Sequence, residues 1–462
     1  MSFWQSVLGN EIHHFEQAYP GSKDCTSEEM HRAVQDWFSL YFDREVTEQE
    51  DPCQRLPYTI VNKLVRACFS EYTAEAKDET VFVQQILEQL DAVRRQALQL
   101  TLIGGEAWLK PVPDGKNFYF TVMRRDRVAV LGRNVRGEPN ALGSAEVLFR
   151  DGSFYTLLEK RSTDTNGRLM IENRLFCSRD GQSIGSPVPL ATLPEYAQLK
   201  ERAVLEGVGN LGLVYLRMPV ENCVDGSPDG VSVYAAAAGL IHNINRNERQ
   251  LSREFENGES RVFASADLLT RRKTGERQLP AGLFVGLDDD PETTGLTIFS
   301  PELRQESFLA RKREYLRNVE SLIGLKRGIL GEVEAAQRTA TEVTSSEGDY
   351  SLTIQELQQM WEHAVRQAVM LCGQLGVLCR LPDARKALDA DAVCLQWGNG
   401  VLHDREKEWV QAMELVNAGM LKPEIALAWR YEMPWQSQAA LEEVRKRYMP
   451  ERAFCKDGKE KD

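Results

Sequence analysis

The sequence contains one glycine motif with the letters of a dinucleotide-binding loop, Gly207-Val-Gly-Asn-Leu-Gly212. In a dinucleotide-binding fold the glycines follow a strand and open a helix, so that the pyrophosphate meets the helix N-terminus. Here a helix-like run over 195–205 precedes the glycines, and a strand-like run over 213–216 follows them. We therefore expect 207–212 to be a plain flexible loop, and we expect no bound cofactor.

Nucleotide hydrolysis requires a different glycine loop, G-x-x-x-x-G-K-[ST], which cradles phosphates and supplies a hydroxyl to Mg²⁺. The sequence has no such loop: Gly115-Lys116 is followed by Asn117, and Gly458-Lys459 is followed by Glu460. This absence argues against a nucleotide-driven motor. The letters G-x-S-x-G of a nucleophile turn occur once, at Gly181-Gln-Ser-Ile-Gly185, but Pro187 and Pro189 follow where such a turn needs a helix. We therefore predict a protein that is not an enzyme.

Metal-ligating residue types are present, but not at metal-ligand spacing. Asp288-Asp-Asp290 lacks the alternating ligands, the glycine and the terminal glutamate of a calcium loop, and His13-His14 has no acid or cysteine at ligand spacing. The nine cysteines include no C-x-x-C pair, so we expect reduced thiols rather than disulfides or a zinc site. They stand at positions 25, 53, 68, 177, 223, 372, 379, 394 and 455. We predict that the chain holds no metal.

The chain of 462 residues carries a formal net charge of −13, which disfavours a protein that grips nucleic acid over its whole surface. Residues 302–330 differ, with seven basic and four acidic side chains. They form either a solvated helix face with ion pairs between residues three or four apart, or a local contact for a polyanion or for acidic neighbours. No apolar run is long enough to span a membrane, and the N-terminus lacks the basic region of a signal peptide, so we expect a soluble intracellular protein.

The first half of the chain mixes helical and strand patterns. Apolar residues recur at helical spacing over 28–42, 57–72 and 80–100. Strand-like runs separated by turn signals follow at 107–110, 118–122, 128–131, 145–149 and 154–158. We expect an antiparallel sheet attached to a helical layer, and the stretch Asn222–Gly230 is the clearest candidate linker.

After residue 230 the pattern becomes helical. One helix is predicted over 232–256 and another over 301–323, with Ser300 as its N-cap, Pro301 at its first position and Gly324 just beyond its end. Between them lies a Gly/Pro-rich insert, 258–300, with strand-like runs at 261–264, 283–285 and 296–299. We expect an antiparallel hairpin of two rods with a small β knob.

The rest of the chain adds a third long helix and several short ones. Residues 324–350 are the most flexible stretch expected between long helices, and a capping box of Thr353 and Glu356 predicts the start of the third. A strand-like run over 392–397 and short amphipathic helices from 404 to about 448 follow. The expected fold class is α+β and mostly helical.

The order of these elements resembles the portal proteins of tailed bacteriophages, in particular the siphophage-type branch. Two short motifs are similar to those of the family. They are Gly230-Val-Ser-Val-Tyr234, before the first long helix, and Phe255-Glu-Asn-Gly-Glu-Ser-Arg-Val-Phe263, at its end. Leu322-Ile-Gly-Leu-Lys-Arg-Gly-Ile-Leu330 precedes Arg338-Thr-Ala-Thr-Glu-Val343, which is similar to the family's K-T-A-T-E-hydrophobic segment with Arg for Lys. Gly104-Gly105-Glu-Ala-Trp108, with Lys110, resembles the family's G-x(3–4)-K start of a strand, and the resemblance covers nearly the whole chain.

The resemblance implies a portal fold, which divides the chain as follows: an α/β wing at 1–230, stem helices at 231–257 and 301–323, a β-containing clip at 258–300, a tunnel-loop region at 324–350, a long bent helix with a returning wing strand at 351–403, a helical crown at 404–449 and a flexible tail at 450–462. It also implies a function. The family forms a ring, normally of twelve subunits, at one capsid vertex, through which double-stranded DNA is packaged and ejected.

The partners implied are further copies of the chain, double-stranded DNA held without sequence preference, the large terminase subunit, the head-tail adaptor protein, and the major capsid and scaffolding proteins. The location implied is the virion, and the host cytoplasm during assembly. Candidate DNA-facing residues are Lys326, Arg327 and Arg338, the basic residues of the tunnel-loop region, although Arg338 has Glu334 and Glu342 at ion-pair spacing. The residues that match the family motif are Thr339, Ala340, Thr341 and Glu342.

Two other classes of protein are weighed against this one. A capsid-associated or scaffold protein without a channel is the alternative. The large terminase subunit, an ATPase and nuclease, fits less well, because the sequence lacks a phosphate loop.

Overall fold

The computed structural model describes residues 14–42, 54–77, 81–164, 166–180, 183–257, 261–264, 270–271, 277–278, 296–299, 303–331, 340–384, 388, 392–397, 405–431, 433 and 438–449. The chain divides into two compact units, Met1–Gly400 and Val401–Asp462. Helices and strands are mixed along the chain, which agrees with the α+β expectation.

The described part of the first unit begins with the helices α2 (His14–Ala18), α3 (Glu28–Phe42), α4 (Leu56–Cys68) and α5 (Val81–Gly104). Ser27 caps α3, because its hydroxyl accepts a hydrogen bond from the Met30 N–H at 3.1 Å. Most of the apolar positions that predicted these helices are buried, since helical spacing gathers them on one face, although Val81 at the start of α5 is 62% exposed. The three helices predicted over 28–100 are therefore confirmed, with shifted ends.

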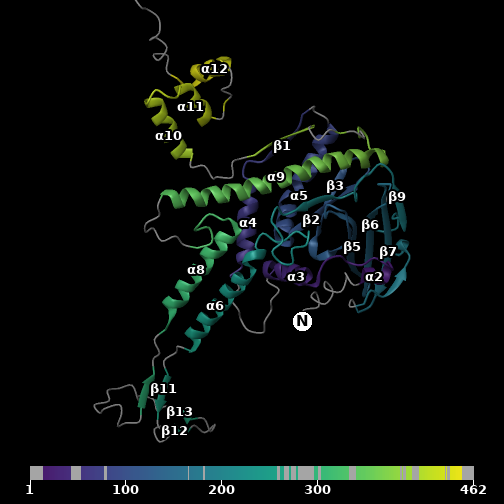
Figure 1. Cartoon of the computed structure of the whole chain (residues 1–462), viewed down its shortest axis with the longest axis horizontal. Coiled ribbons are helices and arrows are strands. Elements are labelled where there is room, and N and C mark those ends of the chain that lie inside the picture. The colour runs from purple at the N-terminus through teal and green to yellow at the C-terminus, as the bar shows by residue number, and fades with distance from the viewer. Residues whose placement is uncertain are drawn as a thin grey trace, which may run out of the picture. The chain divides into compact units, whose positions relative to one another are not determined.

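Two antiparallel sheets pack with these helices (Figure 1). The smaller has the order β10-β2-β3, from Val214–Arg217, Glu106–Pro113 and Phe118–Arg124, and its inner face joins the core of α3, α4 and α5. The larger has the order β4-β5-β6-β7-β8, with β9 also paired to β7. Its strands are β4 (Val128–Arg133), β5 (Pro139–Arg150), β6 (Ser153–Thr163), β7 (Leu169–Ser178), β8 (Ser186–Val188) and β9 (Arg202–Leu205).

The helix expected over 195–205 is wrong. Arg202–Leu205 is strand β9, which pairs with Leu169–Glu172 of β7. Leu193 and Tyr196 are buried in a cluster with Leu157 and Leu175 of the large sheet. Packing and pairing with a distant part of the chain therefore override the local helical pattern.

Two long helices, α6 (Ala238–Asn257) and α8 (Gln305–Ile323), lie side by side (Figure 1). A single 3₁₀ turn, Ala235–Ala237, leads into α6. Strands β11 (Arg261–Ala264) and β14 (Leu296–Phe299) pair antiparallel between them, and the short strands β12 (Thr270–Arg271) and β13 (Arg277–Gln278) form a second ladder. This is the expected hairpin with a β insert, while the strand expected at 283–285 lies outside the described residues.

The start of α8 differs from the prediction. The helix begins at Gln305, and Leu303 and Arg304 are not helical. The Arg304 side chain forms an ion pair with Glu254 of α6 at 2.7 Å, which holds this residue against the neighbouring helix. Ser300 and Pro301, the predicted cap and first position, lie outside the described residues.

Helix α9 runs from Ala340 to Leu378, so the predicted helix start at Thr353 is wrong. Thr353 lies inside the helix, where its hydroxyl donates a hydrogen bond to the Asp349 carbonyl at 3.1 Å instead of capping an end. Strand β15 (Val393–Gln396) follows and pairs antiparallel with β1 (Thr73–Ala76). The strand predicted at 392–397 is thus confirmed, and its partner comes from the start of the chain.

The second unit contains α10 (Arg405–Asn417), α11 (Pro423–Arg430) and α12 (Gln438–Tyr448). Gly419 has a φ of 72° in the turn after α10, a conformation that favours glycine, and Pro423 stands in the first turn of α11. The short helices expected after residue 404 are confirmed.

Candidate functional site

Two of the candidate DNA-facing residues, Lys326 and Arg327, lie together in the turn that follows α8. Lys326 is half-buried and Arg327 is exposed. Gly324 ends the helix with a φ of 72°, and the Leu325 N–H donates to the Glu320 carbonyl at 2.8 Å. Leu325 is buried in the core, so the turn is fixed immediately before the two basic residues.

Glu320 holds this turn from within. Its side chain is buried, and its carboxylate accepts hydrogen bonds from the N–H groups of Gly328, at 3.0 and 3.1 Å, and Leu330, at 2.7 Å. These backbone donors close the turn 324–330 around the carboxylate. Within the stretch 324–350 that is expected to be flexible, residues 324–331 form a hydrogen-bonded turn on the end of α8, and residues 332–339 lie outside the described residues.

Helix α9 supports the same turn. The Thr353 hydroxyl lies 3.4 Å from the Gly324 carbonyl oxygen, and a Cβ added at Gly324 would lie only 2.6 Å from that hydroxyl. Glycine is therefore required at 324 both by its backbone conformation and by the approach of α9.

The remaining candidates follow this turn in the chain. Arg338 and Thr339 lie outside the described residues. Ala340, Thr341 and Glu342 begin α9, so part of the expected tunnel-loop region is helical.

The basic residues of 303–330 make ion pairs of two kinds, of which only the first kind matches the expected pairing of residues three or four apart. Arg317 pairs with Glu314, three residues away, at 3.3 Å. Two pairs cross to α6: Arg304 with Glu254, and Lys312 with Glu248 at 2.8 Å. The hydrogen bonds from Arg304 lower the pKa of Glu254 below its ordinary value.

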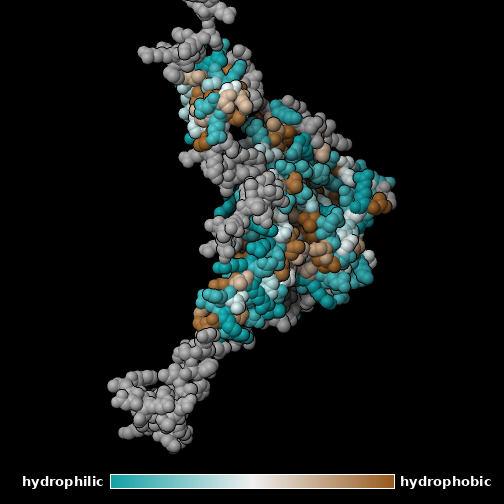
Figure 2. Space-filling model, turned by 60° about the vertical axis from the view of Figure 1, so that its left-hand side comes forward, coloured by the Kyte–Doolittle hydropathy of each residue, from teal (hydrophilic) through white to brown (hydrophobic). Residues whose placement is uncertain are grey.

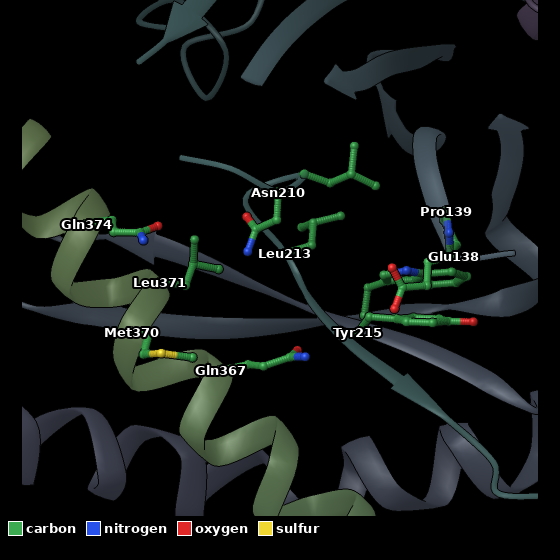
Figure 3. A pocket seen from close by; sticks show the side chains of 11 residues that line it. Glu138, Pro139, Asn210, Leu213, Tyr215, Gln367, Met370, Leu371 and Gln374 are labelled. Atoms are coloured by element: carbon green, nitrogen blue, oxygen red, sulfur yellow. The ribbon is translucent and has the colours of Figure 1, made fainter. Parts of the chain in front are cut away.

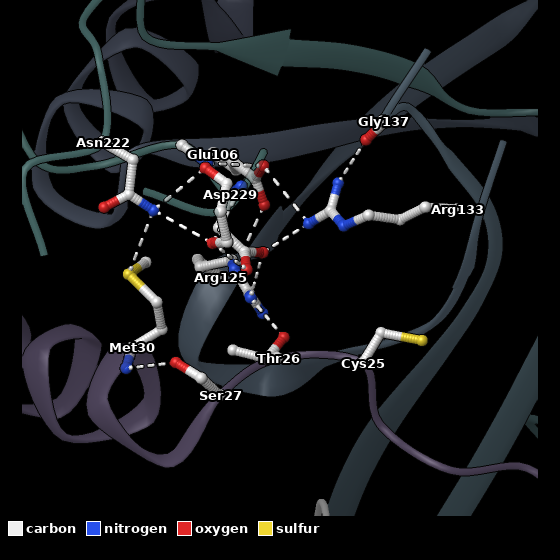
Figure 4. A network of polar contacts seen from close by, with 12 residues as sticks. Cys25, Thr26, Ser27, Met30, Glu106, Arg125, Arg133, Gly137, Asn222 and Asp229 are labelled. Atoms are coloured by element: carbon white, nitrogen blue, oxygen red, sulfur yellow. Dashed lines mark hydrogen bonds and ion pairs between the residues drawn. The ribbon is translucent and has the colours of Figure 1, made fainter. Parts of the chain in front are cut away.

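A second group of charges, which sequence reasoning missed, is buried where the two sheets meet the segment 222–230 (Figure 4). The Arg125 guanidinium is fully buried and lies 3.1 Å from both Glu106 and Asp229. Arg133 also pairs with Asp229, and the Tyr215 hydroxyl donates to Glu106 at 2.6 Å. Burial alone would lower the pKa of Arg125, but the two carboxylates raise it above its ordinary value.

This network shows that Asn222–Gly230 is not a linker. Asp229 is buried against the two arginines, and the Gly230 N–H donates to Glu106 at 2.8 Å. A Cβ added at Gly105 would lie 2.4 Å from the backbone of Gly230, so the two chain segments touch. The polar residues of this segment, which are typical of a loop, here form hydrogen bonds and ion pairs with buried groups. In the sequence, the motif Gly104-Gly105-Glu106 was the feature that could have indicated this site.

The glycine motif 207–212 lines a cavity of about 330 Å³ (Figure 3). Asn210 of this loop, Leu213 and Tyr215 face Gln367, Met370 and Leu371 of α9 across it. Strand β9 precedes the loop and strand β10 follows it, so no helix N-terminus is available to a pyrophosphate. The loop thus has no dinucleotide-binding geometry.

No group of three or more metal-ligating side chains occurs among the described residues. Within that part of the chain, His31 lies 3.2 Å from Asp24, and His242 lies 2.9 Å from Asp36. The seven cysteines described there are free thiols, and burial raises the pKa of Cys68 to about 12. His13 and Asp288–Asp290 lie outside the described residues. No helix in the described part is long and apolar enough to span a membrane.

No protein-family profile matches the chain, and no curated protein matches it. Two similar solved structures are "Neck of native GTA particle computed with C12 symmetry" and "Neck of empty GTA particle computed with C6 symmetry". The first has a TM-score of 0.47 at 13% identity and covers 91% of this chain and 98% of its own. The second has a TM-score of 0.48 at 13% identity and covers 90% and 97%. Both TM-scores lie below 0.5.

Proposed function

We propose that this chain is the subunit of a homo-oligomeric ring of portal type, most simply with twelve copies, that serves as the DNA channel at one capsid vertex of a phage-like particle. The observation that carries the proposal is the paired helices α6 and α8, closed by the β11–β14 ladder and followed by the Glu320 turn. The order of these elements along the chain, and the sequence motifs within them, are the features that resemble the portal family.

The helix pair suits contacts between copies and with DNA. At about 1.5 Å per residue, the 20 residues of α6 form a rod of roughly 30 Å. Residues 238–257 and 303–331 together carry ten basic and six acidic side chains in a chain of net −13. A rod with both signs on its exposed face can pair with a neighbouring copy, because opposite charges can be brought into register.

The remaining charge suits a channel in which DNA slides. Twelve copies at −13 each would carry a formal charge of about −156, which repels phosphates instead of trapping them. Lys326 and Arg327, held at one turn, would then give a limited positive contact within a largely acidic ring. In this proposal the protein is not an enzyme, and it docks the terminase and then the head-tail adaptor.

Electron microscopy of the purified full chain tests the proposal. We expect closed rings with a central hole. The rings should contain twelve or thirteen copies, because a ring that assembles from purified subunits outside the particle can include one extra copy. Monomers or dimers alone at high protein concentration would contradict the proposal and favour the capsid-associated protein without a channel.

A further inference from the structure

The cavity between the loop 207–212 and α9 has a chemistry that a DNA channel does not require. Its volume of about 330 Å³ lies at the lower end of the range for small-molecule sites. One wall is aromatic, because Trp108 and Tyr215 line the cavity and their rings stack with centroids 5.6 Å apart. Leu213, Met370 and Leu371 add apolar surface, whereas the described surface visible in Figure 2 is largely hydrophilic. A small cavity with a flat aromatic wall suits one planar ring system.

Amide side chains surround this wall (Figure 3). Asn210 lies on the loop, and Gln367 and Gln374 extend from α9 towards it. The Asn210 Oδ1 accepts a hydrogen bond from the Gly212 N–H at 2.9 Å, which leaves the amide NH₂ group of Asn210 to donate to a ligand. The Gln367 amide nitrogen lies 2.7 Å from the His363 Nε2, which leaves the carbonyl oxygen of Gln367 to accept. The cavity therefore offers both donors and acceptors beside its flat wall.

One donor at the cavity lacks an acceptor. Trp108 is 1% exposed, and its indole N–H is buried without a hydrogen-bond partner among the described residues. A buried donor left unpaired costs about 1–3 kcal/mol. A ligand that carries an acceptor atom on the edge of its ring can satisfy this group.

The charge of the cavity favours a ligand without phosphate. None of the described residues that line it is basic, and the one acidic side chain is the exposed Glu138, whose carboxylate accepts from the Asn134 amide at 2.8 Å. Strand β10 follows the glycine loop, so no helix N-terminus replaces the missing cations. A phosphate group here would meet a carboxylate and no positive partner.

We propose that this cavity binds one neutral purine or pyrimidine base, free or as its nucleoside, stacked on the Trp108–Tyr215 wall. A nucleobase is planar and uncharged, and its edge carries the donors and acceptors that amide side chains match in pairs. Asn210 donates to that edge and Gln367 accepts from it. All the lining residues belong to the first unit of one chain, so this inference does not depend on the proposed ring.

Saturation-transfer NMR of the purified full-length chain tests the proposal, with adenine, adenosine, cytidine and adenosine monophosphate as the probes. We expect saturable binding of at least one of the three probes that lack phosphate. Adenosine monophosphate should bind at least about tenfold more weakly than adenosine, because its phosphate meets the Glu138 carboxylate. Ribose alone should not bind, since the sugar has no aromatic face to stack.

Two variants test the named contacts. Gln367→Leu removes an amide at the cavity and should weaken binding about fivefold or more. Gln359→Leu is the matched control, because it makes the same change at an exposed position of α9 that does not line the cavity. Trp108→Phe keeps an aromatic ring in the wall but removes the N–H, so it should also weaken binding. Thermal melting shows whether Trp108→Phe is folded, and Gln367→Leu decides the test if it is not.

Three results would overturn the proposal: no saturable binding of adenine, adenosine or cytidine to the wild type, equal effects of Gln367→Leu and Gln359→Leu, or adenosine monophosphate that binds as tightly as adenosine. Electron microscopy of the same samples reports separately on ring formation. A failure of base binding is therefore distinguishable from a failure of the proposed function.

Discussion

Glu320 decides the shape of the turn that presents Lys326 and Arg327. Its buried carboxylate accepts hydrogen bonds from two backbone N–H groups, and removing it leaves those donors without a partner. We expect Glu320→Ala to lower the free energy of unfolding by about 1–3 kcal/mol, and Glu320→Gln by less, because the amide oxygen still accepts. Urea unfolding measures the loss, and the exposed Glu314→Ala is the control. A loss no larger in Glu320→Ala than in Glu314→Ala would show that the turn does not depend on this carboxylate.

Glu159 on β6 makes stability depend on pH. It is buried between Arg161, at 2.7 Å, and Lys110, at 2.8 Å. Burial would raise the pKa of Glu159, but the two cations outweigh it and lower the pKa from 4.5 to about 2. A carboxyl whose pKa is lower in the folded state stabilises the protein above about pH 4.5 and loses that contribution as the pH falls towards 2.

We therefore expect the stability difference between wild type and Glu159→Gln to shrink by on the order of 3 kcal/mol from pH 6 to pH 2. Urea unfolding at a series of pH values measures it. Glu195→Gln removes an exposed ion pair with Arg150 and serves as the control, with a change below about 1 kcal/mol. A difference that stays constant with pH would mean that Glu159 has the same pKa in both states.

At the scale of elements, Arg125 joins the segment 222–230 to the sheets. It lies just before β4, while its partners are Glu106 at the start of β2 and Asp229 in the segment between β10 and α6. Arg125→Met would leave two buried carboxylates that only Arg133 balances. We expect it to cost about 3–5 kcal/mol of unfolding free energy, against less than about 0.5 kcal/mol for the exposed Arg136→Met. Equal losses in the two variants would show that the network adds nothing to stability.

The turn after α8 is the element that the proposed function places nearest to DNA. Reversing both Lys326 and Arg327 to Glu should leave rings intact, because the turn is held by Glu320 and Leu325, which the variant keeps. The amount of DNA packaged or retained should fall, since phosphate contacts are lost. Lys200→Glu with Arg202→Glu makes the same charge change on exposed residues of the first unit and should have no effect. Normal packaging by intact Lys326→Glu, Arg327→Glu rings would show that this turn does not contact the phosphate backbone.

At the scale of the whole molecule, the expected activity is passive. The sequence has no phosphate loop, and the described residues hold no metal-ligating cluster. We expect purified rings to hydrolyse no ATP and to cut no DNA in the presence of Mg²⁺. ATP hydrolysis or DNA cleavage that stays with the ring through successive purification steps would contradict this expectation and would favour a motor or nuclease function.

The sequence by itself determined the helices and many of the strands, because apolar spacing and turn residues act over a few positions. The helices α3, α5, α6 and α8 and the glycine that ends α8 were predicted in this way. Lys326 and Arg327 were singled out through the family resemblance, as basic residues of the region that it implies to be the tunnel loop.

Only the tertiary structure decided which distant segments meet. The pairing of 73–76 with 393–396, the strand at 202–205 and the burial of Asp229 each depend on residues far apart in the chain. The role of Glu320 was missed for the same reason. In a helix rich in charged residues the sequence pattern predicts a solvated side chain, but the backbone of 328–330 folds back and donates hydrogen bonds to its carboxylate. Helix α9 likewise begins at Ala340, before its predicted cap, and Thr353 inside it donates a hydrogen bond to the Asp349 carbonyl.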